Sequence, residues 1–85
     1  RRLAGTGFVT QISQSRFLLP DAIQDLAAIA EVLAVENELT AAGFRNKSGI
    51  GRNMTIEILE FFDKAGFTKR EGNTRHIVKP AAGLF

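Results

Sequence analysis

Apolar residues recur at a helical spacing between residues 21 and 36. This segment is entered through Pro20-Asp21 and ends near Asn37, which are residue types common at helix ends. The positions that share one helical face, at the i, i+3, i+4, i+7 spacing, are Ile23, Leu26, Ala27, Ala30, Leu33 and Ala34. The pattern predicts a long first helix with one buried face.

A short second helix is predicted over about residues 41–48. Thr40 precedes it and is a suitable N-cap, because a threonine hydroxyl can accept a hydrogen bond from a free backbone N–H at a helix start. The next four residues, Ser48 to Gly51, contain two glycines and predict a tight turn. The apolar side of this helix is expected to consist of Ala41, Ala42 and Phe44.

A third helix is predicted over about residues 52–65, followed by a β-hairpin. Gly66 ends the helix, since glycine adopts the left-handed conformation of a C-terminal cap without strain. Residues 67–71 and 75–79 are β-prone, and Gly72-Asn73 between them suits a two-residue II′ turn. The side chains of this helix that we expect to be buried are Thr55, Ile56, Leu59 and Phe62.

The order helix, helix, glycine-containing turn, helix, hairpin is typical of a winged helix-turn-helix. The fold class expected is therefore mainly α with a small β wing (α+β), in which three helices form a bundle and the hairpin is the wing. Phe67 and Ile77 are expected to close the wing over the bundle. The tail Pro80 to Phe85 has no pattern that predicts a structure.

Two stretches of the chain resemble each other at a constant offset. The run Gly7 to Leu19 matches the run Gly66 to Val78 without a gap, and Arg16 falls opposite Arg75. Each run reads as a helix-ending glycine, a phenylalanine, a strand, a polar turn and a second strand. We therefore expect residues 1–20 to be the wing hairpin of a truncated preceding winged helix, beginning with the last turn of its helix at residues 1–4. Residues 21–80 would be a complete winged-helix domain, and 81–85 a tail.

Composition excludes several classes of protein. The chain has 85 residues, 45% apolar and 24% charged, which suits one small globular domain. It contains no cysteine and one histidine, so a disulfide framework and a thiolate zinc site are excluded, and we expect neither metal nor cofactor. No apolar run approaches the ~20 residues of a membrane helix, and no signal peptide is evident, so a cytoplasmic protein without membrane contact is expected. Glu57 and Glu60 have no partner suggestive of catalysis, and we expect a binding module that is not an enzyme.

Positive charge is concentrated in the second half of the chain. Residues 1–40 hold three Lys/Arg and five Asp/Glu, whereas residues 41–85 hold eight and four. Such an asymmetry can mark a surface that binds a polyanion, although the same charges can also be an ordinary solvated surface.

The candidate contacts to nucleic acid lie at the start of the third helix and on the wing. Free backbone N–H groups and the helix dipole favour a phosphate at a helix start, where Arg52 also lies. The wing arginines could instead discourage edge pairing, His76 could be a half-buried wing residue, and the cations of the second helix could simply be solvated. The candidate RNA-binding residues are Arg52, Asn53, Arg45, Lys47, Lys69, Arg70, Arg75 and His76.

The acidic residues of the third helix influence which nucleic acid is expected. Glu57, Glu60 and Asp63 are predicted to be exposed, and they would face phosphates if the helix lay deep in a DNA major groove. Only the first turn of the helix suits an anion. A compact, bent RNA backbone therefore fits the surface better than a long straight duplex.

Three runs of residues resemble a known family. These are Gly-x-Gly-Arg at 49–52, Ile-Leu-Glu-Phe-Phe-Asp at 58–63 and Gly-Phe-Thr-Lys-Arg at 66–70. At these spacings the chain resembles the C-terminal winged-helix domain of the bacterial selenocysteine-specific elongation factors, the SelB family. The likeness is close over about thirty residues from Phe44 to Asn73, and the first helix after Phe17-Leu18-Leu19-Pro20 is also similar.

The resemblance implies a function in translation. The domain would hold the selenocysteine insertion (SECIS) hairpin of an mRNA, with Arg52 and Asn53 at the hairpin loop and with Arg70, Arg75 and His76 as supporting contacts. Asn53 departs from the lysine expected at this position. The ribosome and selenocysteyl-tRNA would be contacted only by missing parts of a parent GTPase, and the chain is expected to be a monomer. The alternatives are a winged-helix DNA-binding domain of a transcription regulator and a protein-docking module, because a fold alone does not assign a function.

Overall fold

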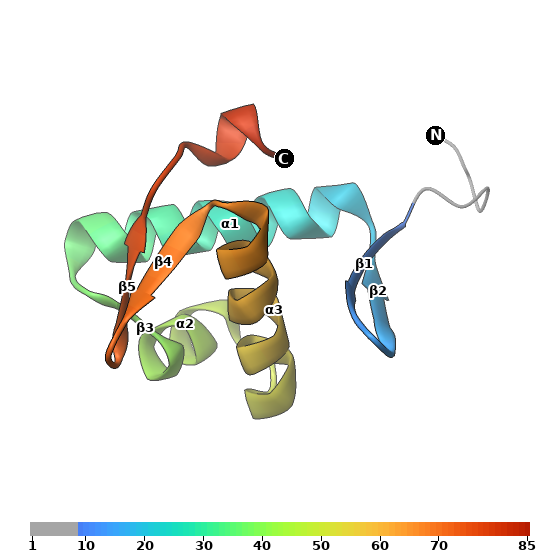
Figure 1. Ribbon diagram of the computed structural model, residues 1–85. Coiled ribbons are helices and arrows are strands. Elements are labelled where there is room, and N and C mark those ends of the chain that lie inside the picture. Colours follow the sequence, from blue (N-terminus) through green and yellow to red (C-terminus); the bar gives the residue numbers. More distant parts are fainter. Residues whose placement is uncertain (1–8) are drawn as a thin grey trace.

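The computed structural model describes residues 9–85 (Figure 1). The helical turn expected at residues 1–4 lies outside the described residues, as does the start of the first repeated run. Within residues 9–85, no helix combines the length and the apolar character needed to cross a membrane.

The three helices form where the sequence predicts them: α1 spans Pro20–Glu36, α2 Ala41–Ser48 and α3 Arg52–Ala65. The N-cap role of Thr40 is confirmed, because its hydroxyl accepts a hydrogen bond of 3.0 Å from the Gly43 N–H. Gly49 and Gly66, with φ of 77° and 82°, end α2 and α3 in the left-handed conformation.

The wing is a three-stranded antiparallel sheet of order β3-β5-β4, not the hairpin alone. Strands β4 (Thr68–Glu71) and β5 (Thr74–Ile77) form the predicted hairpin, and the positive φ of 60° at Gly72 suits the first position of a II′ turn. The third strand, β3 (Leu39–Thr40), was not predicted, since two residues are too short for a recognisable pattern. It ties the loop between α1 and α2 to the wing.

The core lies between the three helices and the wing. Phe44, Phe62 and Phe67 are fully buried and lie close together, with ring centroids of Phe62 and Phe67 5.0 Å apart. Two expectations about buried side chains are wrong. Ile56 is 42% exposed and Ile58, at 0%, takes its place in the core, while Ala42 is exposed.

The tail has a structure that its sequence did not predict. A short 3-10 helix, η1 (Ala81–Gly83), lies beside α1, where the Ala81 N–H donates to Glu31 Oε2 at 2.9 Å. The Phe85 ring lies 5.4 Å from that of Phe67, between centroids. The tail therefore covers one side of the aromatic core.

The predicted hairpin within residues 1–20 is present, as β1 (Thr10–Ser13) and β2 (Arg16–Leu18). It packs beside α3, on the flank away from the wing (Figure 1), and Ile12 is only 8% exposed. Its assignment to a preceding winged-helix module remains a prediction.

Candidate nucleic-acid interface

One stretch of the chain contains three cations and no acid. From Leu39 to Ile56 the chain contains Arg45, Lys47 and Arg52 and no aspartate or glutamate. This stretch comprises β3, α2, the glycine turn and the first turn of α3. A polyanion can follow it without meeting a carboxylate of the same segment.

The start of α3 is exposed, and no side chain within residues 9–85 caps its first backbone N–H groups. Its N-cap is Gly51, which has no side chain to accept hydrogen bonds from the first N–H groups. Arg52 and Asn53 are exposed, and ideal Cβ atoms placed on Gly49 and Gly51 would meet nothing within 4 Å. A phosphate can therefore approach the backbone here closely, in the field of the helix dipole.

The two cations of α2 differ in whether they form an ion pair. Arg45 is exposed and forms no ion pair within residues 9–85. Lys47 lies 3.1 Å from Glu36 Oε1, at the end of α1, in an exposed pair. Such surface pairs contribute about 0–1 kcal/mol, so Lys47 can exchange this partner for a phosphate at little cost.

The wing residues fall into two groups. Lys69 and Arg70 are exposed on β4, and Arg70 Nε donates to the Gly72 carbonyl at 3.0 Å. His76 is exposed and paired with Glu71 on the neighbouring strand. Arg75 has a side chain only 9% exposed, because its guanidinium turns inward to Asp63. Of the wing candidates, Arg75 is therefore the least able to reach a ligand.

Helix α2 lies between the wing and the start of α3. Figure 1 shows the wing turn, α2 and the N-terminal end of α3 along the same lower side of the molecule. The wing turn adjoins the start of α2, since Arg70 and Asn73 line a small hollow together with Thr40 and Ala42. The predicted site residues thus follow one edge in the order wing, α2, glycine turn, α3. Arg75 lines the same hollow, with its guanidinium paired with Asp63.

Two of the three acids predicted to be exposed on α3 are held in ion pairs. Asp63 Oδ1 accepts hydrogen bonds from Arg75 Nε at 3.1 Å and from the Thr68 hydroxyl at 2.5 Å. Asp63 Oδ2 accepts from Arg75 Nη2 at 3.1 Å. Glu57 Oε1 accepts from Arg16 Nε at 2.9 Å and from the Ser13 hydroxyl at 2.6 Å. Both carboxylates are therefore neutralised within the molecule, and only Glu60 remains exposed.

The ion pair of Glu57 with Arg16 changes the reason why duplex DNA fits α3 poorly. The charge of Glu57 no longer opposes a phosphate as a free carboxylate would. Instead, the β1–β2 hairpin bonded to it occupies the flank of α3, which restricts how deeply the helix can enter a major groove. The start of α3 stays accessible.

Sequence reasoning missed Ser13 and Arg16, which position α3. The available signal was the internal repeat, in which Arg16 and Arg75 occupy equivalent places. Both arginines pair with a carboxylate of α3, Arg16 with Glu57 and Arg75 with Asp63. The repeat alone does not predict the contact of Arg16 with α3, because Glu57 and Asp63 are not equivalent positions.

The hydrogen bonds to Glu57 make its contribution depend on pH. The Arg16 and Ser13 hydrogen bonds, with the Arg16 charge, hold the pKa of Glu57 below its ordinary value of 4.5. Because the pKa of Glu57 is lower in the folded state, the stability that its carboxylate contributes is fully present above pH 4.5. This contribution is lost as the pH falls through the folded-state pKa. We expect the difference in unfolding free energy between the wild type and Glu57→Gln to shrink as the pH falls from 6 to 3.

Urea unfolding at several pH values measures this difference. Glu60→Gln is the matched control, since Glu60 is exposed on the same helix and forms no ion pair within residues 9–85. A Glu57→Gln difference that stays constant across this range would contradict the role given to the Glu57 carboxylate.

The described residues offer no metal site. Within residues 9–85, no three His, Cys, Asp or Glu side chains are grouped so as to hold a metal ion. The chemistry of this edge is that of cations and amide donors.

Comparisons with known proteins agree on one family. A family model described as "Elongation factor SelB, winged helix" matches residues 31–77. The selenocysteine-specific elongation factor of Escherichia coli (strain K12) is 40% identical over 82 residues, which cover 95% of this chain and 13% of that protein. The protein of the same name from Haemophilus influenzae is 32% identical over 74 residues, 86% of this chain and 12% of its own length.

A solved structure extends the likeness to three dimensions. The mRNA-binding domain of elongation factor SelB from E. coli, determined in complex with SECIS RNA, matches with a TM-score of 0.82 and 37% sequence identity. The match covers 88% of this chain and 63% of that one.

Proposed function

The chain belongs to the winged-helix family of elongation factor SelB, and from this premise we propose that it binds the SECIS stem-loop of an mRNA. The observation that carries the proposal is the cationic stretch Leu39 to Ile56, which contains no aspartate or glutamate and includes the uncapped start of α3. It is supported by the similarity to an mRNA-binding domain that was solved with SECIS RNA.

The proposed contacts divide between loop and backbone. The α3 start, with Arg52 and Asn53, would meet the RNA loop, where the arginine fork and the asparagine amide can bond phosphate, sugar or a base edge. Arg45, Lys47, Lys69, Arg70 and His76 would follow the phosphate backbone along α2 and the wing. Arg75 would act indirectly, by holding the wing on α3 through Asp63.

The chain spans 13% and 12% of the two elongation factors that it matches. We propose that a larger cytoplasmic GTPase contains this module, and that its other parts contact the ribosome and selenocysteyl-tRNA. The module itself would be a monomeric tether that holds the factor near a recoded UGA codon and performs no chemistry.

The proposal is tested by comparing three probes at several salt concentrations: a SECIS stem-loop RNA, the same stem with an altered loop, and a duplex DNA of equal length. We expect the stem-loop to bind most tightly, with an affinity that falls as salt is raised because phosphate contacts release counterions. A preference for the duplex would point to a DNA-binding regulator, and absence of binding to every probe would reject a nucleic-acid function.

Arg52→Ala is expected to weaken binding of the stem-loop RNA by about 1–3 kcal/mol, the range for one good polar contact to nucleic acid. Folding should be unaffected, because Arg52 is exposed at the helix start. Lys64→Ala removes an exposed cation at the opposite end of α3 and is the matched control. Equal affinities of the two variants, measured by fluorescence anisotropy, would show that the contact lies elsewhere.

A further inference from the structure

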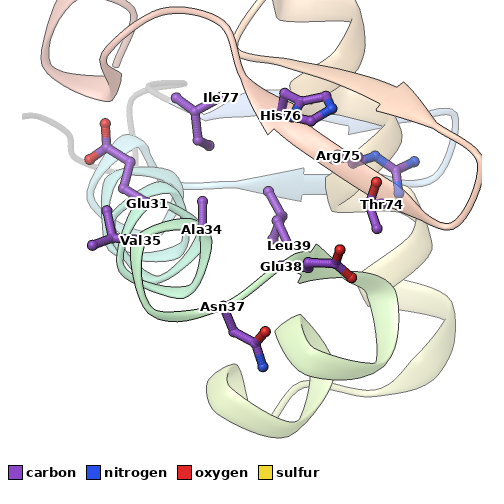
Figure 2. Close-up of a pocket in the computed structure, with 10 residues that line it drawn as sticks. All are labelled: Glu31, Ala34, Val35, Asn37, Glu38, Leu39, Thr74, Arg75, His76 and Ile77. Atoms are coloured by element: carbon purple, nitrogen blue, oxygen red, sulfur yellow. The ribbon is translucent and has the colours of Figure 1, made fainter.

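A groove separates the C-terminal half of α1 from the wing, and no residue of α2 or α3 lines it. It has a volume of about 630 Å³ and is lined by α1, the loop after it, β3 and β5. Figure 2 shows Ala34 and Leu39 between the helix and the strand, with Glu31 at one end and Glu38 at the other. Val35 lies on its α1 side and is 87% exposed. The groove therefore combines an apolar floor with a carboxylate at each end.

The charge around the groove is opposite to that of the RNA edge. From Pro20 to Glu38 the chain contains no lysine or arginine, and of its acids Glu31 and Glu38 line the groove. Arg75 and His76 also line the groove, but Arg75 is paired with Asp63 and His76 with Glu71. A nucleic acid would be repelled here, whereas a cationic ligand would be attracted.

The wall formed by β5 points to a polypeptide. In the antiparallel pair of β4 and β5, Val78 N–H donates to the Phe67 carbonyl, so the backbone groups of alternate residues Arg75 and Ile77 face away from β4. On that side β3 pairs with Arg75 and Thr74 only. The Ile77 N–H and C=O thus lie at an open sheet edge beyond the end of β3, along the groove. An extended chain can add to such an edge through its main chain.

We propose that this groove binds an extended, basic and apolar polypeptide segment of a partner protein. The segment would pair its backbone with Ile77, place an apolar side chain against Ala34 and Val35, and direct lysine or arginine side chains to Glu31 and Glu38. The groove contains no residue of α2 or α3, and of the proposed RNA contacts it shares only His76. This proposal stands whether or not the proposed RNA function is correct.

The test uses the 85-residue chain and two synthetic peptides, acetyl-Lys-Val-Lys-Val-Lys-amide and its Glu-Val-Glu-Val-Glu counterpart. Amide chemical shifts in an ¹H–¹⁵N NMR titration locate the peptide and give its Kd. We expect the lysine peptide to shift the amides of Ile77, Ala34 and Val35, and the glutamate peptide to leave them unchanged. A lysine peptide N-methylated at its central residue should bind more weakly, because it loses a backbone donor.

Two groups of variants separate this site from the RNA edge. The double variant Glu31→Gln/Glu38→Gln should weaken the lysine peptide about threefold to tenfold, the effect of two partly exposed ion pairs. Glutamine at position 31 can still accept from the Ala81 N–H, so the tail is retained. Glu60→Gln and Arg52→Ala should leave peptide binding unchanged, and the double variant should not weaken RNA binding. The proposal would be overturned if the lysine peptide did not shift the Ile77 amide or if the two peptides bound equally well. It would also be overturned if the double variant bound the lysine peptide as tightly as the wild type does.

Discussion

Replacing Phe62 with alanine is expected to lower the free energy of unfolding by about 3–5 kcal/mol, a large part of the ~5–15 kcal/mol of a small domain. The Phe62 side chain is 0% exposed. Its ring centroid lies 5.0 Å from that of Phe67, 5.6 Å from Phe85 and 6.3 Å from Phe44. Truncation removes the ring on which α2, the wing and the tail converge, and it leaves a cavity that these elements can fill only in part.

Chemical denaturation measures this loss, and Ile56→Ala is its matched control. Ile56 lies on the same helix but is 42% exposed, so its truncation should cost about 0.5 kcal/mol or less. Comparing the two variants tests which face of α3 is buried, because the sequence pattern predicts a buried Ile56 and the structure has it exposed. Similar losses for the two variants would mean that the helix is rotated about its axis relative to the structure.

Asp63→Ala is expected to destabilise the domain by about 2–4 kcal/mol. Removing one partner of a buried ion pair leaves the other charge unpaired, at ~3–5 kcal/mol for a fully buried pair. The lower range applies because Asp63 retains 27% side-chain exposure while that of Arg75 is 9%. The buried Thr68 hydroxyl loses its acceptor as well. The result would be read from thermal and urea unfolding.

Two further variants separate charge from packing at this pair. Asp63→Asn keeps an oxygen for Thr68 but loses the charge, so its loss should be smaller than that of Asp63→Ala. Asp63→Ala/Arg75→Met removes both charges and fills the space of the arginine stem, and it should recover most of the stability. A double variant no more stable than Asp63→Ala would show that the ion pair is not the source of the effect.

The helices could be predicted because their end signals are local. Thr40 caps α2 within one turn, and Gly49 and Gly66 end α2 and α3 by their own conformation. The buried face of α3 was harder to assign, since apolar residues lie on several sides of this helix, and the predicted face included Ile56 in place of Ile58. Strand β3 and the docking of Phe85 depend on contacts between distant residues, for which a short sequence carries no local pattern.

The cations of the candidate site could be predicted from the sequence, but the ion pairs that they form could not. The cations of the edge could be found from sequence, because they cluster in a stretch without acids. Whether a cation can reach a ligand depends on whether a carboxylate lies next to it in the fold. Arg70 and Arg75 both flank the wing turn in sequence, but only Arg75 is buried against a carboxylate. The same limit hid the contacts of Glu57 with Ser13 and Arg16.

Arginines from two different hairpins hold α3, Arg16 at its second turn through Glu57 and Arg75 at its last turn through Asp63. Such a doubly braced helix is pre-organised, so its first turn already has the geometry in which it would meet a ligand. Little conformational entropy is then lost from the protein when a ligand binds, and most of the ordering must come from the ligand itself.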